Sequence, residues 1–300
     1  MMSFFLSFYR SLNYVPAILC TGLMLVVTAG CGSSKQIESS RVSEAMQIDG
    51  DFDDWPSGSI RNDIADDFDV AIGNDDEYVY IGVSFRNNRT WQQARDHGLR
   101  IYIDSDATFR RAFGIVFPVG IVSALGDIPG ARKSYLENPN WQNLDRNKRI
   151  VEEAEDKMRQ RVEIIRRSDR DDRIRPVNVS KAQLEANGIL VGMSETSRVM
   201  SVELRIPIDD GSEDYFAVIP NRNGRFNVRF EIEPLSYEEI TGEAVGYRTV
   251  DAADPRGDTR SVSGGRTGSQ RSRQELDVEN PRLYSALSYK YEARVEVELK

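Results

Sequence analysis

The chain has 300 residues, of which 40% are apolar and 29% are charged, and its net charge is −9. This composition is typical of a globular protein and not of one embedded in a membrane. The acidic balance argues against nucleic-acid binding, since nucleic-acid binders present a basic face. The length permits one large domain or two of ordinary size.

Residues 1–30 are typical of an export signal. Arg10 precedes an apolar run at 15–28, which is too short to span a bilayer comfortably. The run ends in Val-Val-Thr-Ala-Gly-Cys, which resembles the bacterial lipobox and implies that Cys31 carries a lipid. Because Gly32 and not Asp follows the cysteine, the resemblance implies the outer membrane of a Gram-negative bacterium. An ordinary secretory signal or an N-terminal helix anchor is the alternative.

The part of the chain that follows the signal has no cysteine besides Cys31, since Cys20 would leave with the signal. Disulfide, thiol nucleophile and cysteine-bound metal are therefore not expected. Residues 31–44 are polar and rich in serine, so we predict a flexible tether. Residues 45–300 are predicted to form a single domain, which is long enough to bury a core without disulfides.

The segment 48–56, Ile-Asp-Gly-Asp-Phe-Asp-Asp-Trp-Pro, predicts a tight turn at Asp49 and Gly50. Its four aspartates invite a calcium site. The spacing fails the EF-hand pattern, because Asp54 stands where glycine is needed and Ile60 where glutamate is needed. A looser Ca²⁺ site built with a distant loop stays open, and a solvated acidic turn is the favoured interpretation.

Strands dominate the remainder, recognised by alternating apolar and polar residues. They are predicted at 68–72, 78–85, 99–103, 113–117, 201–206, 226–233 and 291–299. The first two form a hairpin around residues 73–76. Strands with one apolar and one charged face indicate antiparallel sheets that are half buried. Strands of this kind, with loops of mixed length between them, predict a mainly β protein with an antiparallel two-sheet β-sandwich.

Several segments resemble the carbohydrate-binding module family 9 (DOMON-like) superfamily. The turn at 48–56 is similar to the family's I-D-G-x-x-D/E-x-W opening, and residues 66–87 to the hairpin that follows it. Later, Val-Glu-Leu-Arg-Ile-Pro at 202–207 resembles its E-x-x-I-P strand, and 227–233 the next strand. The resemblance implies a β-sandwich and, more loosely, sugar binding.

Three segments depart from the strand pattern. Residues 140–169 carry apolar residues at helical spacing, which predicts one long inserted helix. It would cover a sheet face, or serve as a lid or partner surface. A short helix is predicted at 181–187, with Ser180 as N-cap and Gly188 beyond its C-terminus. Residues 251–280 are rich in glycine, serine and arginine, which predicts a disordered loop near the C-terminus.

Motifs for catalysis are missing: the sequence has no GxSxG, GxxxxGK or HExxH. The single histidine, His97, is interpreted as a loop residue, with a lone haem ligand as the minor alternative. With 48 acidic residues, a carboxylate pair for glycoside hydrolysis is neither indicated nor excluded.

Aromatic residues are the candidates for a sugar site, because flat rings stack on the C–H faces of sugars. Trp91 and Trp141 lie in polar contexts and are predicted ligand contacts, whereas Trp55 is predicted to be a core residue. Tyr102 lies opposite the apolar face of its strand. It would line a binding platform or, as we favour, lie under the inserted helix.

We therefore expect a membrane-anchored, non-catalytic protein that binds a carbohydrate or another ligand of the cell envelope. One alternative is a structural lipoprotein that binds a protein partner, which the sequence does not identify. A second is a glycoside hydrolase or a haem-binding domain. No cofactor is predicted apart from the open Ca²⁺ site.

Overall fold

The computed structural model describes residues 35–44, 46–109, 112–138, 140–166, 176–195, 200–209, 216–236, 240, 286 and 288–300. Lys35 to Lys300 form one compact unit. The predicted signal peptide at 1–30, Cys31 and the predicted loop at 251–280 lie outside the described residues.

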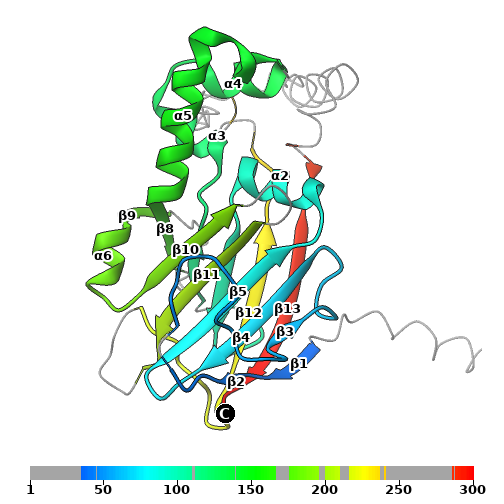
Figure 1. Cartoon of the computed structure of the whole chain (residues 1–300), viewed down its shortest axis with the longest axis vertical. Helices are drawn as coiled ribbons and strands as arrows, with labels where there is room; N and C mark the ends of the chain where they lie inside the picture. The colour runs from blue at the N-terminus through cyan, green and yellow to red at the C-terminus, as the bar shows by residue number, and fades with distance from the viewer. Residues whose placement is uncertain are drawn as a thin grey trace, which may run out of the picture. The chain divides into compact units, whose positions relative to one another are not determined.

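Two sheets form the predicted β-sandwich (Figure 1), but each contains one parallel pair and is therefore mixed, whereas wholly antiparallel sheets were predicted. Sheet A contains seven described strands, in the spatial order β1 (Lys35–Glu38), β13 (Tyr291–Glu298), β12 (Arg225–Ile232), β6 (Arg100–Asp104), β7 (Phe113–Val116), β8 (Arg161–Arg166) and β9 (Val177–Ser180). Sheet B contains six, namely β10 (Leu190–Glu195), β11 (Met200–Pro207), β5 (Tyr78–Phe85), β4 (Phe68–Asn74), β2 (Ser40–Arg41) and β3 (Ile60–Arg61), which pairs with β4. The pairs β1–β13 and β2–β4 are parallel, and the other described pairs are antiparallel.

The main core lies between the two sheets and is built from the inward apolar residues of the longer strands. Phe68 on β4 and Phe230 on β12 meet across the sheets, with ring centroids 5.6 Å apart and an edge-on geometry. Both rings are fully buried. The period-two pattern therefore places one face of each sheet inside, as a sandwich requires.

The N-terminal part of the described chain is structured, which corrects the predicted tether. Residues 35–38 form β1 on β13, and Ile37 inserts into the main core with 4% of its surface exposed. Ser39 is buried and donates to Asn74 Oδ1 at 2.5 Å. A strand with a single buried apolar residue shows no alternation, so the sequence pattern concealed it.

The turn at 48–56 packs on the outer face of sheet B. Trp55 is buried, as predicted, and its Nε1 donates to Glu203 Oε1 of β11 at 2.5 Å. Gly50 N donates to Glu203 Oε2 at 2.8 Å. A Cβ at Gly82 would lie 2.7 Å from the Phe52 ring and 2.9 Å from the Trp55 ring, so the glycine leaves the space that both rings occupy.

The described helices are α2 (Asn88–His97), α3 (Ile121–Ala124), η1 (Leu125–Asp127), α4 (Ala131–Glu137), η2 (Trp141–Asn143), α5 (Asp145–Gln160) and α6 (Lys181–Glu185). The short helix α6 is capped by Ser180, as predicted, and forms a full capping box with Gln183. None of the helices in the described part of the chain is long and apolar enough to cross a membrane.

The predicted long helix at 140–169 is wrong in its extent. It begins as a 3-10 turn, continues as α5 and ends at Gln160, after which the chain becomes strand β8. Val162 and Ile164 alternate into the main core there. The stretch Val162 to Ile165 fits a helical spacing as well as an alternating one, and pairing with β7 decides for the strand.

The helices α3 to α5 form a second layer with its own apolar core at one end of the sandwich (Figure 1). We call it the helical layer, meaning residues 121–138 and 140–160. Tyr135 of α4 donates to Asp96 of α2 at 2.7 Å, and Arg95 of α2 pairs with Glu155 of α5. The helical layer is therefore fixed to the sandwich through α2.

Candidate ligand-binding site

The predicted aromatic contacts are buried in three different places. Trp91 lies on α2 in the main core, 5.8 Å from the ring of Phe85. Trp141 lies in η2 and meets Tyr135 edge-on in the core of the helical layer. Each tryptophan is 9% exposed. Their roles as ligand contacts stay predictions, and in this conformation neither ring offers a ligand an open face.

Tyr102 lies on the outer face of sheet A and not under α5. Its ring is 2% exposed and stacks on Arg229, whose Cζ is 4.5 Å from the ring centroid. Phe109 packs on the same guanidinium at 4.8 Å. Arg229, Phe109 and the neighbouring strand cover the ring, so its role in ligand binding also stays a prediction.

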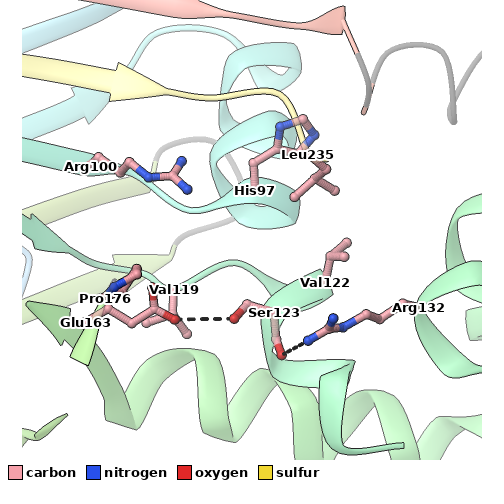
Figure 2. A pocket seen from close by; sticks show the side chains of 9 residues that line it. All are labelled: His97, Arg100, Val119, Val122, Ser123, Arg132, Glu163, Pro176 and Leu235. Carbon is pink, nitrogen blue, oxygen red and sulfur yellow. Dashed lines mark hydrogen bonds between the residues drawn. The ribbon is translucent and has the colours of Figure 1, made fainter. Parts of the chain in front are cut away.

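A polar cavity of about 140 Å³ lies between the end of sheet A and the helical layer (Figure 2). Its lining combines apolar side chains with groups that can donate or accept hydrogen bonds. The lining residues are His97, Arg100, Val119, Val122, Ser123, Arg132, Glu163, Pro176 and Leu235. Sites between two layers are common places for ligands, so we take this cavity as the candidate site.

Two glycines bring the walls of the cavity together. Gly98 ends α2 with φ of 92°, and Gly120 precedes α3 with φ of 76°. A Cβ at Gly120 would lie 2.6 Å from Gly98 N, so no other residue would allow the two segments to approach this closely. Leu99 N donates to Pro118 O at 3.2 Å, and Phe117 N donates to Leu99 O at 2.9 Å.

The strand side of the cavity supplies Arg100 and Glu163. Val116 of β7 pairs with Arg100 of β6 on one side and with Glu163 of β8 on the other, so the three residues form one row on the outer face of sheet A. The Nε of Arg100 is 3.3 Å from Glu233 Oε2. Its Nη1 is buried and has no hydrogen-bond partner among the described residues.

The helical side supplies Ser123 and Arg132. Ser123 Oγ donates to Glu163 Oε1 at 3.4 Å, which links α3 to the sheet, and Arg132 Nη2 donates to Ser123 O at 3.4 Å (Figure 2). A Cβ at Gly126 would lie 1.7 Å from Arg132 Nη2. The missing side chain at Gly126 therefore leaves room for the guanidinium.

His97 is the last residue of α2 and is 5% exposed. Its Nδ1 lies 2.8 Å from the carbonyl oxygen of Glu233, so Nδ1 carries the hydrogen in this contact. The sequence interpretation of a loop residue is corrected, because α2 extends to this position. A cavity of about 140 Å³ is too small for a porphyrin, so His97 lines a site that does not suit haem.

Two of the four aspartates in the turn at 48–56 accept hydrogen bonds from the backbone. Asp49 Oδ1 accepts from Asp51 N at 2.8 Å, and Asp54 Oδ2 accepts from Gln47 N at 2.8 Å. Within the described ranges, no group of three or more histidine, cysteine, aspartate or glutamate residues is arranged to hold a metal ion. The favoured interpretation of a solvated acidic turn agrees with these contacts.

Sequence reasoning missed the residues of the cavity. Arg100 and Glu163 are polar alternates of strands, and such positions are usually solvated. Ser123 and Arg132 lie on short helices that were not predicted. The one available signal was the pair of glycines, Gly98 and Gly120, at the ends of adjacent predicted strands, where close backbone approach is common.

The fold and the site together define a β-sandwich with a helical layer and a small polar cavity between them. No protein-family model and no curated protein matches the chain. Among solved structures, it is similar to a carbohydrate-binding module of family 9 from Caldicellulosiruptor kristjanssonii in complex with glucose. The identity is 11%, the match covers 89% of this chain and 96% of that chain, and the TM-score is 0.34. At this TM-score the likeness says nothing about the ligand of this chain.

Proposed function

We propose that this protein is a lipid-anchored, non-catalytic protein of the cell envelope that binds carbohydrate, with one sugar unit held in the polar cavity. The observation that carries the proposal is the cavity itself, since its size and its mixed lining both suit a sugar ring. The resemblance of the turn at 48–56 and of the later strands to a carbohydrate-binding family points in the same direction.

The volume of the cavity suits a single six-membered ring. It measures about 140 Å³. A protein cavity of ~150 Å³ is known to accommodate a benzene ring. The six-membered ring of one pyranose unit at the end of a glycan would therefore fit the space, and its outer substituents and the rest of the glycan would extend outside.

The lining offers both kinds of contact that a sugar needs. Val119, Val122 and Leu235 present apolar surface for the C–H groups of a ring. Arg100, Ser123 and Glu163 present donors and acceptors for its hydroxyl groups. A few placed polar groups among apolar side chains are what small-molecule sites generally contain.

The anchoring part of the proposal rests on Cys31 in its lipobox-like context. Strand β1 begins at Lys35, so the lipidated residue would be at most about 14 Å from the sandwich at roughly 3.5 Å per residue. The helical layer lies at the end of the sandwich away from β1 (Figure 1).

Membrane fractionation tests the anchoring. The wild-type chain is expected in the outer-membrane fraction of a density gradient, and Cys31→Ser is expected in the soluble fraction or as unprocessed precursor. Wild-type protein that fractionates as soluble would contradict the proposal.

A glycan array tests the ligand. The full chain, purified in detergent, is expected to bind a defined set of glycans. Ser123→Trp places a large ring in the cavity at an exposed position and should abolish that binding. Ser57→Trp, an equally exposed position on the turn at 48–56, is the matched control. A wild-type chain that binds no glycan, or a Ser123→Trp chain that binds as well as wild type, would refute the proposal.

A further inference from the structure

The polar cavity contains a charged donor that nothing in the described chain satisfies. Glu233 holds the guanidinium of Arg100 at Nε, whereas Nη1 is buried and makes no hydrogen bond. Native structures rarely leave a buried N–H without an acceptor, because the desolvated group is costly. Arg100 extends into the cavity (Figure 2), so a ligand is in a position to supply that acceptor.

Two guanidinium groups and one carboxylate line the cavity, those of Arg100, Arg132 and Glu163. The carboxylate of Glu233, outside the lining, pairs with Arg100 at Nε and leaves Nη1 without an acceptor. Arg100 enters from the strand side and Arg132 from the helical side (Figure 2). Glu163 accepts a hydrogen bond from Ser123 of α3, so one of its carboxylate oxygens already has a donor.

A carboxylate suits these donors better than a hydroxyl group does. A hydroxyl accepts but also brings a hydrogen that needs an acceptor, whereas a carboxylate only accepts. Hydrogen bonds between a guanidinium and a carboxylate are also about twice as strong as bonds between neutral groups. The unsatisfied Nη1 of Arg100 therefore calls for a carboxylate.

We propose that the sugar bound in the cavity is acidic, and that its carboxylate lies between Arg100 and Arg132. The hydroxyl groups of its ring lie toward Ser123 and Glu163. This inference rests on the proposed carbohydrate function and narrows it to uronic acids and related sugar acids. Free anions such as acetate and phosphate share the charge but lack the ring.

Calorimetric titration of the full chain tests the inference with matched probes. D-glucuronic acid and D-galacturonic acid are each compared with their methyl esters and with D-glucose and D-galactose. The acid that binds is expected to bind roughly 10- to 100-fold more tightly than its ester, which is the range for a hydrogen bond to a charged group. Acetate and inorganic phosphate are expected to bind at least about tenfold more weakly than that acid, because they forgo the contacts of the ring.

The variants locate the effect. Arg100→Gln should remove the preference for acid over ester, and Arg132→Gln should reduce it. Arg149→Gln, the same change at a side chain that is 88% exposed on α5, should leave it intact. The comparison of acid with ester uses the wild-type chain alone. It therefore tests the preference for an acidic sugar even if a substitution disturbs folding.

The outcomes separate the two proposals. Equal binding of acid and ester, or array hits confined to neutral glycans, would overturn the acidic ligand and leave carbohydrate binding in place. Acetate or phosphate that binds as tightly as the uronic acids would show a bare anion site and also overturn it. No binding of any probe, together with a silent array, would remove both proposals.

Discussion

The buried carboxylate of Glu203 makes the stability of this fold depend on pH in an unusual direction. The side chain is fully buried under the turn at 48–56, and burial is the largest of the effects that raise its pKa to about 7 from an ordinary 4.5. The charges of Asp54 and Asp49 act in the same direction. The hydrogen bonds from Trp55 and Gly50 oppose the shift without cancelling it.

The size of the effect follows from linkage. Below about pH 4.5 Glu203 is protonated in both the folded and the unfolded chain, and its contribution to stability is complete. As the pH rises from there to about 7, the unfolded chain releases its proton first, so the free energy of unfolding falls. With pKa values of 4.5 and about 7, the loss between about pH 5 and about pH 8 is ~2.5 kcal/mol.

Urea denaturation of wild type and Glu203→Gln at the two pH values measures this loss. The glutamine cannot titrate, and its NH₂ faces one of the two N–H donors, so the variant should be less stable than wild type by about 1–3 kcal/mol at about pH 5. At about pH 8 this difference should be lost, because only the wild-type chain pays for ionising the buried carboxyl group. The drop in unfolding free energy between the two pH values should be ~2.5 kcal/mol smaller in Glu203→Gln than in wild type. Glu185→Gln, at an exposed position on α6, should keep the wild-type drop. Equal drops in wild type and Glu203→Gln would refute the reasoning.

Three further predictions concern the cavity, the turn and the N-terminal strands. Gly126→Ala should displace the guanidinium of Arg132, weakening ligand binding about tenfold by calorimetry with little change in melting temperature; unchanged affinity would contradict the assigned contact. Gly82→Ala should clash with the rings of Phe52 and Trp55 and lower the free energy of unfolding by about 1–3 kcal/mol in urea, and a neutral effect would show that these rings do not pack there. Deletion of residues 35–41 should cost about 2–3 kcal/mol, since it exposes the core around Ile37, whereas a tether could be removed at no cost.

The sandwich was predictable because the alternation of apolar and polar residues shows which side chains of a strand are buried. Residues 78–85 alternate, and every inward apolar residue of that strand is buried. The hairpin with β4 and the capped helix α6 also follow from local chemistry, since turn and cap residues act within a few positions. The tether was predicted wrongly because a strand with one buried residue, Ile37, shows no alternation. The helix was predicted too long because the short apolar run at 162–165 fits the helical and the strand periods equally well.

The candidate site could not be predicted in the same way. Arg100, Ser123, Arg132 and Glu163 come from four elements, and only the register of β6, β7 and β8 and the position of the helical layer bring them together. Trp91 and Trp141 were predicted as exposed ligand contacts because their neighbours in the sequence are polar. Polar neighbours do not show whether a residue lies on the buried face of a helix. Trp91 shares that face with Ala94, three residues further along α2.

The central claim, that the polar cavity holds one sugar unit, is tested most directly by a crystal structure of the full chain with the best glycan from the array. The account predicts electron density for one terminal ring between Arg100 and Arg132, with the remaining units outside the cavity. Density for the glycan at any other surface, with only water in the cavity, would contradict it.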